Sequence, residues 1–562
     1  MQQNEASTYS SKRSLNHLLQ HAIKEYWDRP AFTDMSSLPV TLSYKDVARK
    51  IAKLHILYRE AGIMPGDKIA LCGKNSSVWC VVFLSALTYG AVIVPILADF
   101  KPDNIQNLIN HSDARLAVTD NHIWDGLNPD SMPKLLGALT TRDLSLLFSR
   151  SEALSHARSH LNELFGQEYP DRFGPANVEY HRDPADDLCL ISYTSGSTGF
   201  SKGVMLPYRS LWSNVRYCLD HLPADPGDGV VCMLPLAHMY GLTIDMLRPF
   251  ASGCHIYILT RTPSPRILME AFAEVKPRFI VAVPLIIEKI IRTRVFPLLD
   301  KPLMKLMLSI PFVDDRLLAR IKTRLTDTFG GNLKELIIGG AALNKDVEKF
   351  LRRCGFPYTV GYGMTECGPL ISYSPWDDNR MASCGRAVDR MDLKIASPNP
   401  AEKPGNLLVK GDNVMLGYYN NPEATRAAFD EDGWLDTGDI CNIDDEGFLY
   451  IRGRDKNMIL GASGQNIYPE EIEDKLNNLP YVGESLIVDN GNGRLTALIF
   501  PDLENINNQG ITPGELNGIM DENLRTLNAQ LPAYSQVSGY KLREEEFEKT
   551  PKRSIKRYLY KA

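Results

Sequence analysis

The stretch Tyr193-Thr-Ser-Gly-Ser-Thr-Gly-Phe-Ser-Lys-Gly-Val204 directly follows the apolar, strand-like run from Leu188 to Ile191. It gathers small hydroxyl side chains, glycines and one lysine in a single short loop. Backbone N–H groups and hydroxyls in such a loop can surround phosphate oxygens, so a nucleoside triphosphate is the first ligand to consider. The predicted phosphate-binding residues are Thr194, Ser195, Gly196, Ser197, Thr198, Gly199 and Lys202.

The loop differs from a Walker A motif, because it lacks the Gly-x-x-x-x-Gly-Lys-Ser/Thr spacing and Lys202 is followed by Gly203. Flexible linkers share its Ser/Thr/Gly composition, so this loop alone fits a linker equally well. The remainder of the chain has to decide between these two interpretations.

Three further blocks follow in the chain: Gly361-Tyr-Gly-Met-Thr-Glu366, Trp434-Leu-Asp-Thr-Gly-Asp-Ile440 and Gly453-Arg-Asp-Lys456. With the first loop, they make the chain resemble the acyl-adenylate-forming superfamily of AMP-binding enzymes, and within it the long-chain fatty acyl-CoA ligases. The resemblance extends over the range from about Leu15 to Leu559.

The resemblance implies an α/β fold in two domains. Residues 1–455 would form a large N-terminal domain of layered α/β subdomains plus a β-rich subdomain, and residues 456–562 a small, mobile α+β domain. The alternation of helical and short apolar stretches up to Pro249 independently favours parallel α/β layers. The predicted helices are Leu15 to Tyr26 and Tyr44 to Ala61, and the predicted strands are Lys68 to Cys72, Leu116 to Val118 and Val230 to Met233.

Composition describes an ordinary globular protein of 562 residues, 44% of them hydrophobic and 23% charged. A net charge of −6 provides no general attraction for nucleic acid or for an anionic membrane. The ten cysteines include no Cys-x-x-Cys pair, which argues against a zinc site or a disulfide framework and favours a reducing cytosol. We therefore expect a cytoplasmic protein, and composition leaves open peripheral membrane contact and a homodimer.

Three further stretches are interpreted by their composition, pattern or resemblance. The uncharged range from Asn75 to Ala98 is long enough to span a bilayer, but its Gly90 and Pro95 favour a buried helix ending near Tyr89, a turn and a strand. The polar stretch from Arg142 to Tyr180 is predicted to be a surface insertion. The region from Pro263 to Leu333 resembles the acyl-binding region of the fatty acyl-CoA ligases and predicts a tunnel, although apolar helical faces of this kind usually fill a core.

The resemblance also assigns roles to individual residues. Glu366 would bind Mg²⁺, a cation that needs only one or two protein carboxylates when phosphates supply the other ligands. Asp439 would accept both ribose hydroxyls, and Arg454 would bind ribose and phosphate oxygens. The other expected residues are Thr365 at the α-phosphate, Tyr362 stacked on adenine with Gly363 beside it, Gly339, Gly340 and Ala341 as the wall behind adenine and acyl group, and His238 positioning the substrate carboxylate.

In the C-terminal segment, the resemblance places a hinge at Lys456 and a thiol channel at Ser463 and Gly464. The family usually ends in Thr-Pro-x-Gly-Lys-Ile-x-Arg, but this chain has Ser554 at the lysine position. A serine hydroxyl cannot replace that cation. In an extended segment Lys556 and Lys552 project to the same side as Ser554, so we expect Lys556, or else Lys552, to substitute for the missing amine.

We therefore expect an AMP-forming ligase that uses ATP and Mg²⁺ to activate a medium- or long-chain fatty acid and transfers the acyl group to coenzyme A. Transfer to an acyl-carrier protein, or acyl adenylation alone, is the first alternative. The second alternative is a non-catalytic acyl- or nucleotide-binding homologue, which only Ser554 favours.

Overall fold

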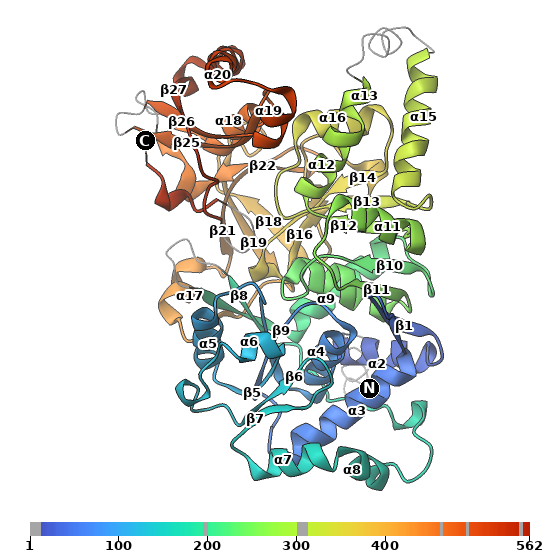
Figure 1. Cartoon of the computed structure of the whole chain (residues 1–562). Coiled ribbons are helices and arrows are strands. Elements are labelled where there is room, and N and C mark those ends of the chain that lie inside the picture. Colours follow the sequence, from blue (N-terminus) through green and yellow to red (C-terminus); the bar gives the residue numbers. More distant parts are fainter. Residues whose placement is uncertain are drawn as a thin grey trace.

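The computed structural model describes residues 13–194, 201–299, 313–460, 465–490, 494–549 and 555–561 (Figure 1). The large N-terminal part contains several sheets, and the residues after Leu460 form a smaller unit at one end of the molecule. This arrangement confirms the predicted α/β fold with a large N-terminal and a small C-terminal domain. No helix within the described residues is both long and apolar enough to cross a membrane.

The largest sheet has eight strands and carries the predicted phosphate loop. In spatial order they are β20 (Gly417–Tyr418), β9 (Lys202–Pro207), β8 (Leu188–Thr194), β4 (Val92–Ile96), β3 (Lys68–Cys72), β5 (Ala114–Thr119), β6 (Gly137–Thr140) and β7 (Leu146–Ser149). Its centre, from β8 to β6, is parallel, as the alternating sequence predicts. Ile69 packs into one hydrophobic cluster with helix α4 (Ser77–Tyr89), whereas Ala70 packs into another with α5 (Pro102–His111). Both faces of the sheet are therefore covered.

Helix α4 forms the first part of the uncharged stretch from Asn75 to Ala98. The Ser76 side chain accepts a hydrogen bond from the Trp79 backbone and begins the helix, and Gly90, with φ +86°, ends it. Strand β4 follows, and α4 is buried along almost its whole length. The predicted helix, turn and strand are confirmed, and the stretch lacks charge because the protein surrounds it on all sides.

A second sheet of four strands lies beside the first. Its strands are β10 (Gly229–Cys232), β11 (His255–Leu259), β1 (Pro30–Met35) and β2 (Val40–Ser43). The helices near it are α2 (Leu15–Glu25), α3 (Tyr44–Glu60), α9 (Tyr208–His221) and α10 (Arg248–Ala251). Helix α3 begins with a reciprocal cap in which Ser43 and Asp46 satisfy each other's backbone N–H groups. Both helices predicted in this region are confirmed to within one residue.

A third, parallel sheet consists of β12 (Phe279–Ala282), β13 (Glu335–Ile338) and β14 (Tyr358–Val360). The helices of this region are α11 (Pro265–Val275), α12 (Pro284–Arg294), α13 (Phe296–Leu299), α15 (Val313–Thr328) and α16 (Lys345–Arg353). Much of the apolar sequence predicted to line a tunnel lies in the core, including Phe279, Ile287 and Ile291. The stretch from Leu303 to Leu308 lies outside the described residues.

The β-rich part of the large domain follows β14. One sheet contains β15 (Tyr362–Gly363), β16 (Leu370–Tyr373) and β17 (Arg386–Ala387), and the other β18 (Met391–Ile395), β19 (Gly405–Gly411), β21 (Leu435–Ile443) and β22 (Leu449–Arg454). The connection from β20 to β21 contains α17 (Pro422–Ala428). These antiparallel strands place the second, third and fourth sequence motifs close to one another.

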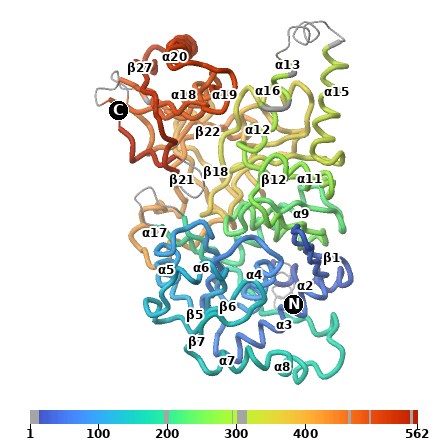
Figure 2. Tube along the Cα trace, in the orientation of Figure 1, coloured from blue at the N-terminus to red at the C-terminus, as the bar shows by residue number. Residues whose placement is uncertain are grey.

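The small C-terminal part has hydrophobic clusters of its own. Its elements are β23 (Ile459–Leu460), β24 (Asn466–Ile467), α18 (Pro469–Leu476), β25 (Val482–Asp489), β26 (Leu495–Pro501), α19 (Leu503–Gln509), α20 (Pro513–Asn528) and β27 (Val537–Leu542). Figure 2 shows this segment, in orange to red, folded as a compact unit beside the end of the large domain that contains α12 and α16.

The predicted surface insertion from Arg142 to Tyr180 was wrong in part. Strand β7 forms the edge of the eight-stranded sheet by pairing with β6, and helix α7 (Glu152–Ser159) buries Leu154 and Ala157 completely. Helix α8 (Leu161–Glu168) follows at the surface. Polar residues dominate this stretch because only one face of each helix contacts the core, and an average over its composition hides that face.

Candidate active site

The predicted phosphate loop connects two antiparallel strands. Thr194 at the end of β8 is opposite Lys202 at the start of β9, so the loop closes a hairpin. Ser195, Gly196, Ser197, Thr198 and Gly199 lie outside the described residues. A strand follows the loop, whereas a helix follows a Walker A loop, which agrees with the different spacing of this motif.

Two predicted site residues, Lys202 and Glu366, meet at Tyr418. The Tyr418 hydroxyl donates a hydrogen bond to Oε1 of Glu366 at 3.0 Å. The Lys202 ammonium lies 4.7 Å from the centre of the Tyr418 ring. Sequence reasoning missed Tyr418, because no motif was recognised around it and only the pairing of β20 with β9 brings it to the site.

Glu366 follows a turn that requires glycine. A Cβ on Gly363 would overlap the carbonyl oxygen of Pro369, so no larger residue fits there without movement of the backbone. Thr365 and Glu366 then form the 3₁₀ turn η4 (Thr365–Cys367), in which each retains 9% of its exposed area. The turn therefore holds both polar side chains at the edge of the core.

The ribose-binding residues predicted from the sequence form one cluster. Asp439 on β21 is opposite Arg454 on β22, and Oδ1 of Asp439 lies 2.7 Å from Nε of Arg454. The Tyr362 hydroxyl donates a hydrogen bond to the other carboxylate oxygen. Burial raises the pKa of Asp439 above its ordinary value, and the nearby Arg454 charge opposes that rise. The cluster thus presents a buried carboxylate held by two donors.

An apolar pocket begins beside this cluster. Its walls come from α9, from the π-helical segment η3 (Gly241–Leu247) with the preceding Tyr240, and from β13, β15 and β16. The lining residues are Tyr217, Cys218, Leu222, Tyr240, Ile244, Ile337, Gly339, Gly340, Gly361, Tyr362, Gly363, Pro369, Leu370 and Tyr373. None of them belongs to the range 263–333, so among the described residues the pocket lies elsewhere than the predicted tunnel.

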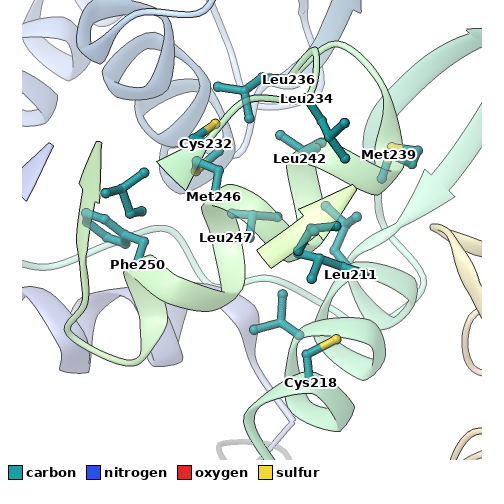
Figure 3. Close-up of a cluster of buried hydrophobic side chains, with 14 of the residues drawn as sticks. Leu211, Cys218, Cys232, Leu234, Leu236, Met239, Leu242, Met246, Leu247 and Phe250 are labelled. Atoms are coloured by element: carbon teal, nitrogen blue, oxygen red, sulfur yellow. The ribbon is translucent and has the colours of Figure 1, made fainter. Parts of the chain in front are cut away.

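The packing behind this pocket fixes its shape. Leu211 and Cys218 of α9 face Leu242 and Leu247 of the π-helical segment in a dense cluster of buried side chains (Figure 3). Two of the lining residues are large aromatics, Tyr217 and Tyr373, whose rings are 6.2 Å apart. The pocket is therefore lined mainly by apolar and aromatic side chains.

Two of the small residues predicted to form the adenine wall, Gly339 and Gly340, line the pocket. A Cβ on Gly339 would come within 3.0 Å of the Tyr240 ring, and Gly340 has φ +86°. Both positions therefore require glycine, one for space and the other for backbone conformation. Ala341 follows them and is exposed. His238 is half-buried on the turn after β10, where its backbone N–H bonds to Pro235.

The structure describes only some of the predicted C-terminal site residues. Lys456 is exposed in η6 (Asp455–Asn457), which follows β22. Lys556 bonds through its ammonium to Glu548 of its own domain at 3.0 Å. The neighbouring Arg557 contacts Glu473 and Glu470 of α18. Ser463, Gly464, Lys552 and Ser554 lie outside the described residues.

A polar contact between the domains was not anticipated from the sequence. Asn478 accepts hydrogen bonds from Arg292 at 2.6 Å and from Asn344 at the start of α16. Next to it, Lys345 lies 3.5 Å from Asp474 of α18. These residues join α12 and α16 of the large domain to α18 of the small one.

The residues fit a magnesium ion that is held mainly by phosphates. Glu366 offers its second carboxylate oxygen, since Tyr418 donates to the first. The described residues contain no group of three or more His, Cys, Asp or Glu side chains able to hold a metal by themselves. One carboxylate together with substrate oxygens is the usual way in which proteins hold Mg²⁺.

Comparison with known proteins points to one family. The family model described as AMP-binding enzyme matches residues 19–419. Among curated proteins, a long-chain-fatty-acid–CoA ligase of Escherichia coli is 28% identical over 84% of this chain and 82% of its own. The long-chain-fatty-acid–[acyl-carrier-protein] ligase AEE15 of Arabidopsis thaliana is 26% identical over 89% of this chain and 79% of its own.

Solved structures show the same fold. ATP-bound MatB from Rhodopseudomonas palustris superposes with a TM-score of 0.76 at 23% identity, covering 97% of this chain and 98% of that one. A fatty acyl CoA synthetase of Mycobacterium tuberculosis superposes with a TM-score of 0.65 at 21% identity and covers 97% of both chains.

Proposed function

Because the chain belongs to the AMP-binding enzyme family, we propose that it is an AMP-forming ligase that joins a fatty acid to coenzyme A. The observation that carries this proposal is the position of the apolar pocket. Tyr362 and Gly363 line it, and Tyr362 also bonds to the buried Asp439. A hydrocarbon chain in the pocket would place its carboxylate next to a nucleotide held by the polar cluster.

In the first half-reaction, a carboxylate oxygen of the acid attacks the α-phosphorus of ATP, and pyrophosphate leaves with the electron pair of the broken P–O bond. Asp439 and Arg454 hold the ribose, Thr365 binds the α-phosphate, and Lys202 contacts the polyphosphate. His238 orients the acid and needs no role as a base, because a fatty carboxylate is already ionised near neutral pH. Glu366 would hold Mg²⁺, which would supply positive charge to the phosphates.

In the second half-reaction, the thiolate of coenzyme A attacks the acyl carbonyl carbon, and AMP leaves. The small domain, 456–562, would turn about Lys456 between the two steps, so that Ser463 and Gly464 line the path of the thiol. Lys456 stands exposed at the junction, which gives the backbone there room to rotate.

The replacement of the family lysine by Ser554 leaves the amine of the first half-reaction to be identified. Lys556 is the first candidate and Lys552 the second. The bond from Lys556 to Glu548 means that this amine must exchange its partner when the small domain turns. An unchanged adenylation rate in both Lys556→Ala and Lys552→Ala proteins would exclude both lysines.

An acyl-carrier-protein thiol is the alternative acceptor. The relative named as a carrier-protein ligase covers about as much of this chain as the relative named as a CoA ligase, so sequence similarity favours neither. The two acceptors share the first half-reaction and differ only in the second.

The test measures AMP release with acids of increasing length in the presence of hydroxylamine, which traps the activated acyl group. The measurement is repeated with coenzyme A and with a phosphopantetheinylated carrier protein. We expect hydroxylamine-dependent AMP with medium or long acids and faster release with coenzyme A. A response to short or aromatic acids alone would contradict the fatty-acid assignment. ATP binding without any AMP or pyrophosphate would identify a non-catalytic binding protein.

A further inference from the structure

Tyr418 lies between two oppositely charged side chains of the site. The Lys202 ammonium rests on its ring, 4.7 Å from the ring centre, and the Glu366 carboxylate accepts a hydrogen bond from its hydroxyl at 3.0 Å. Tyr418 therefore contacts both the cation of the phosphate hairpin and the carboxylate expected to hold the metal.

The backbone around Tyr418 is fixed from several sides. Strand β20 pairs with β9 next to Lys202, with Tyr418 opposite Val204. The Tyr418 N–H donates to the Thr425 hydroxyl at 2.9 Å, and the Met415 N–H donates to the carbonyl of Glu366 at 2.9 Å. Tyr418 is buried and retains only 9% of its exposed area. Its position is thus set by the sheet and does not depend on a bound nucleotide.

From this arrangement we propose that Tyr418 is a positioning residue that keeps Lys202 and Glu366 from pairing with each other. The inference rests on the proposed roles of these two residues. An ammonium and a carboxylate attract strongly where water is scarce, and a direct ion pair would occupy the carboxylate oxygens that Mg²⁺ needs. A cation on an aromatic face is held more loosely and can turn toward a phosphate.

The next residue provides a matched control. Tyr419 also has a lysine on its ring, Lys68 at 5.7 Å, and its hydroxyl also donates to a carboxylate, Asp113, at 2.9 Å. Tyr419 packs against the hydrophobic cluster on the other side of the eight-stranded sheet, whereas Tyr418 belongs to the main core. The two tyrosines make the same kinds of contact, but only Tyr418 faces the site.

The experiment measures binding of ATP by calorimetry at graded Mg²⁺ concentrations, with thermal melting as the check on folding. Tyr418→Leu removes both contacts and should raise the Mg²⁺ concentration for half-maximal binding about tenfold. Tyr418→Phe keeps the ring and should raise it about threefold at most. Tyr419→Leu and Tyr419→Phe should leave it unchanged.

The decisive variant combines Tyr418→Leu with Lys202→Gln. Because Lys202 is itself expected to contact the polyphosphate, the Lys202→Gln single variant is the reference. If the lost ring lets the lysine pair with Glu366, Tyr418→Leu should raise the Mg²⁺ requirement much less in the Lys202→Gln background than in the wild type. An increase that is equally large in both backgrounds would overturn the proposal, as would an unchanged requirement in a folded Tyr418→Leu protein. If Tyr418→Leu does not fold, Tyr418→Phe decides: because it keeps the ring, a Mg²⁺ requirement raised well beyond about threefold relative to Tyr419→Phe would overturn the proposal. Failure of the wild type to bind ATP would instead overturn the proposed function.

Discussion

Tyr217 is a large side chain in the lining of the apolar pocket proposed to hold the acyl chain, so its replacement should change the length of the preferred acid. It lines the pocket, retains only 5% of its exposed area, and its ring lies 6.2 Å from that of Tyr373. Tyr217→Ala would leave space for about four methylene groups, each contributing roughly 0.8 kcal/mol when buried. The sum, about 3 kcal/mol, corresponds to roughly a hundredfold in kcat/KM for acids longer by that number of carbons.

The assay is ATP–pyrophosphate exchange across a series of saturated acids, with kcat/KM determined for each. Tyr208→Ala is the matched control, because Tyr208 is a buried tyrosine at the start of the same helix α9 and its hydroxyl donates to the carbonyl of Leu87, away from the pocket. Both variants should lose stability, by roughly 3–5 kcal/mol for a large buried aromatic. An equal shift in both, or no shift in a folded Tyr217→Ala protein, would refute the assignment of this pocket to the acyl chain.

Three other predictions concern the nucleotide, the domain contact and pH. Tyr362→Phe removes a donor from the buried Asp439 and should weaken ATP binding by about 1–2 kcal/mol, roughly five- to thirtyfold, in calorimetry; equal affinity would argue that the hydroxyl is unimportant. Lys345→Ala removes the partly exposed contact with Asp474, worth about 0.2–1 kcal/mol, and should increase proteolysis at the domain junction by at most about fivefold; slower cleavage would contradict this. Burial lowers the pKa of His55 from 6.5 to about 4. Between these two pH values the folded protein binds fewer protons than the unfolded chain, so it loses stability as the pH falls from 6.5 to about 4. In urea unfolding, the free energy of unfolding of the His55→Gln protein should fall less over the same pH range than that of the wild type. An equal fall in both proteins would exclude this contribution of His55.

Much of the candidate site could be predicted because its residues lie in short, ordered motifs. Lys202, Glu366, Asp439 and Arg454 were all selected from the sequence, and the structure places the last two opposite each other on paired strands. A motif of this kind can be recognised in the sequence, because the turn that presents each side chain is built from adjacent residues.

Residues that act across the fold were not predictable in this way. Tyr418 reaches the site only because β20 pairs with β9, far away in the chain. Tyr217 belongs to an ordinary amphipathic helix, and nothing in its neighbourhood distinguishes a pocket residue from a core residue. The same ambiguity applies to the stretch from Pro263 to Leu333, for which the sequence allowed an acyl tunnel or a core, and in which Ile287 and other described apolar side chains pack in the core.

The sequence by itself determined the family, the order of the motifs and the hydrophobic elements that must be buried, such as α4, because these depend on residue type and local spacing. The tertiary structure alone decided which faces meet: the contacts of Tyr418 with both Lys202 and Glu366, the aromatic residues in the pocket lining, and the contact of Asn478 with the large domain. Each of these requires the packing of segments hundreds of residues apart or from separate sheets and domains. Such packing is fixed by the combined burial of many side chains, and no local stretch of sequence contains that information.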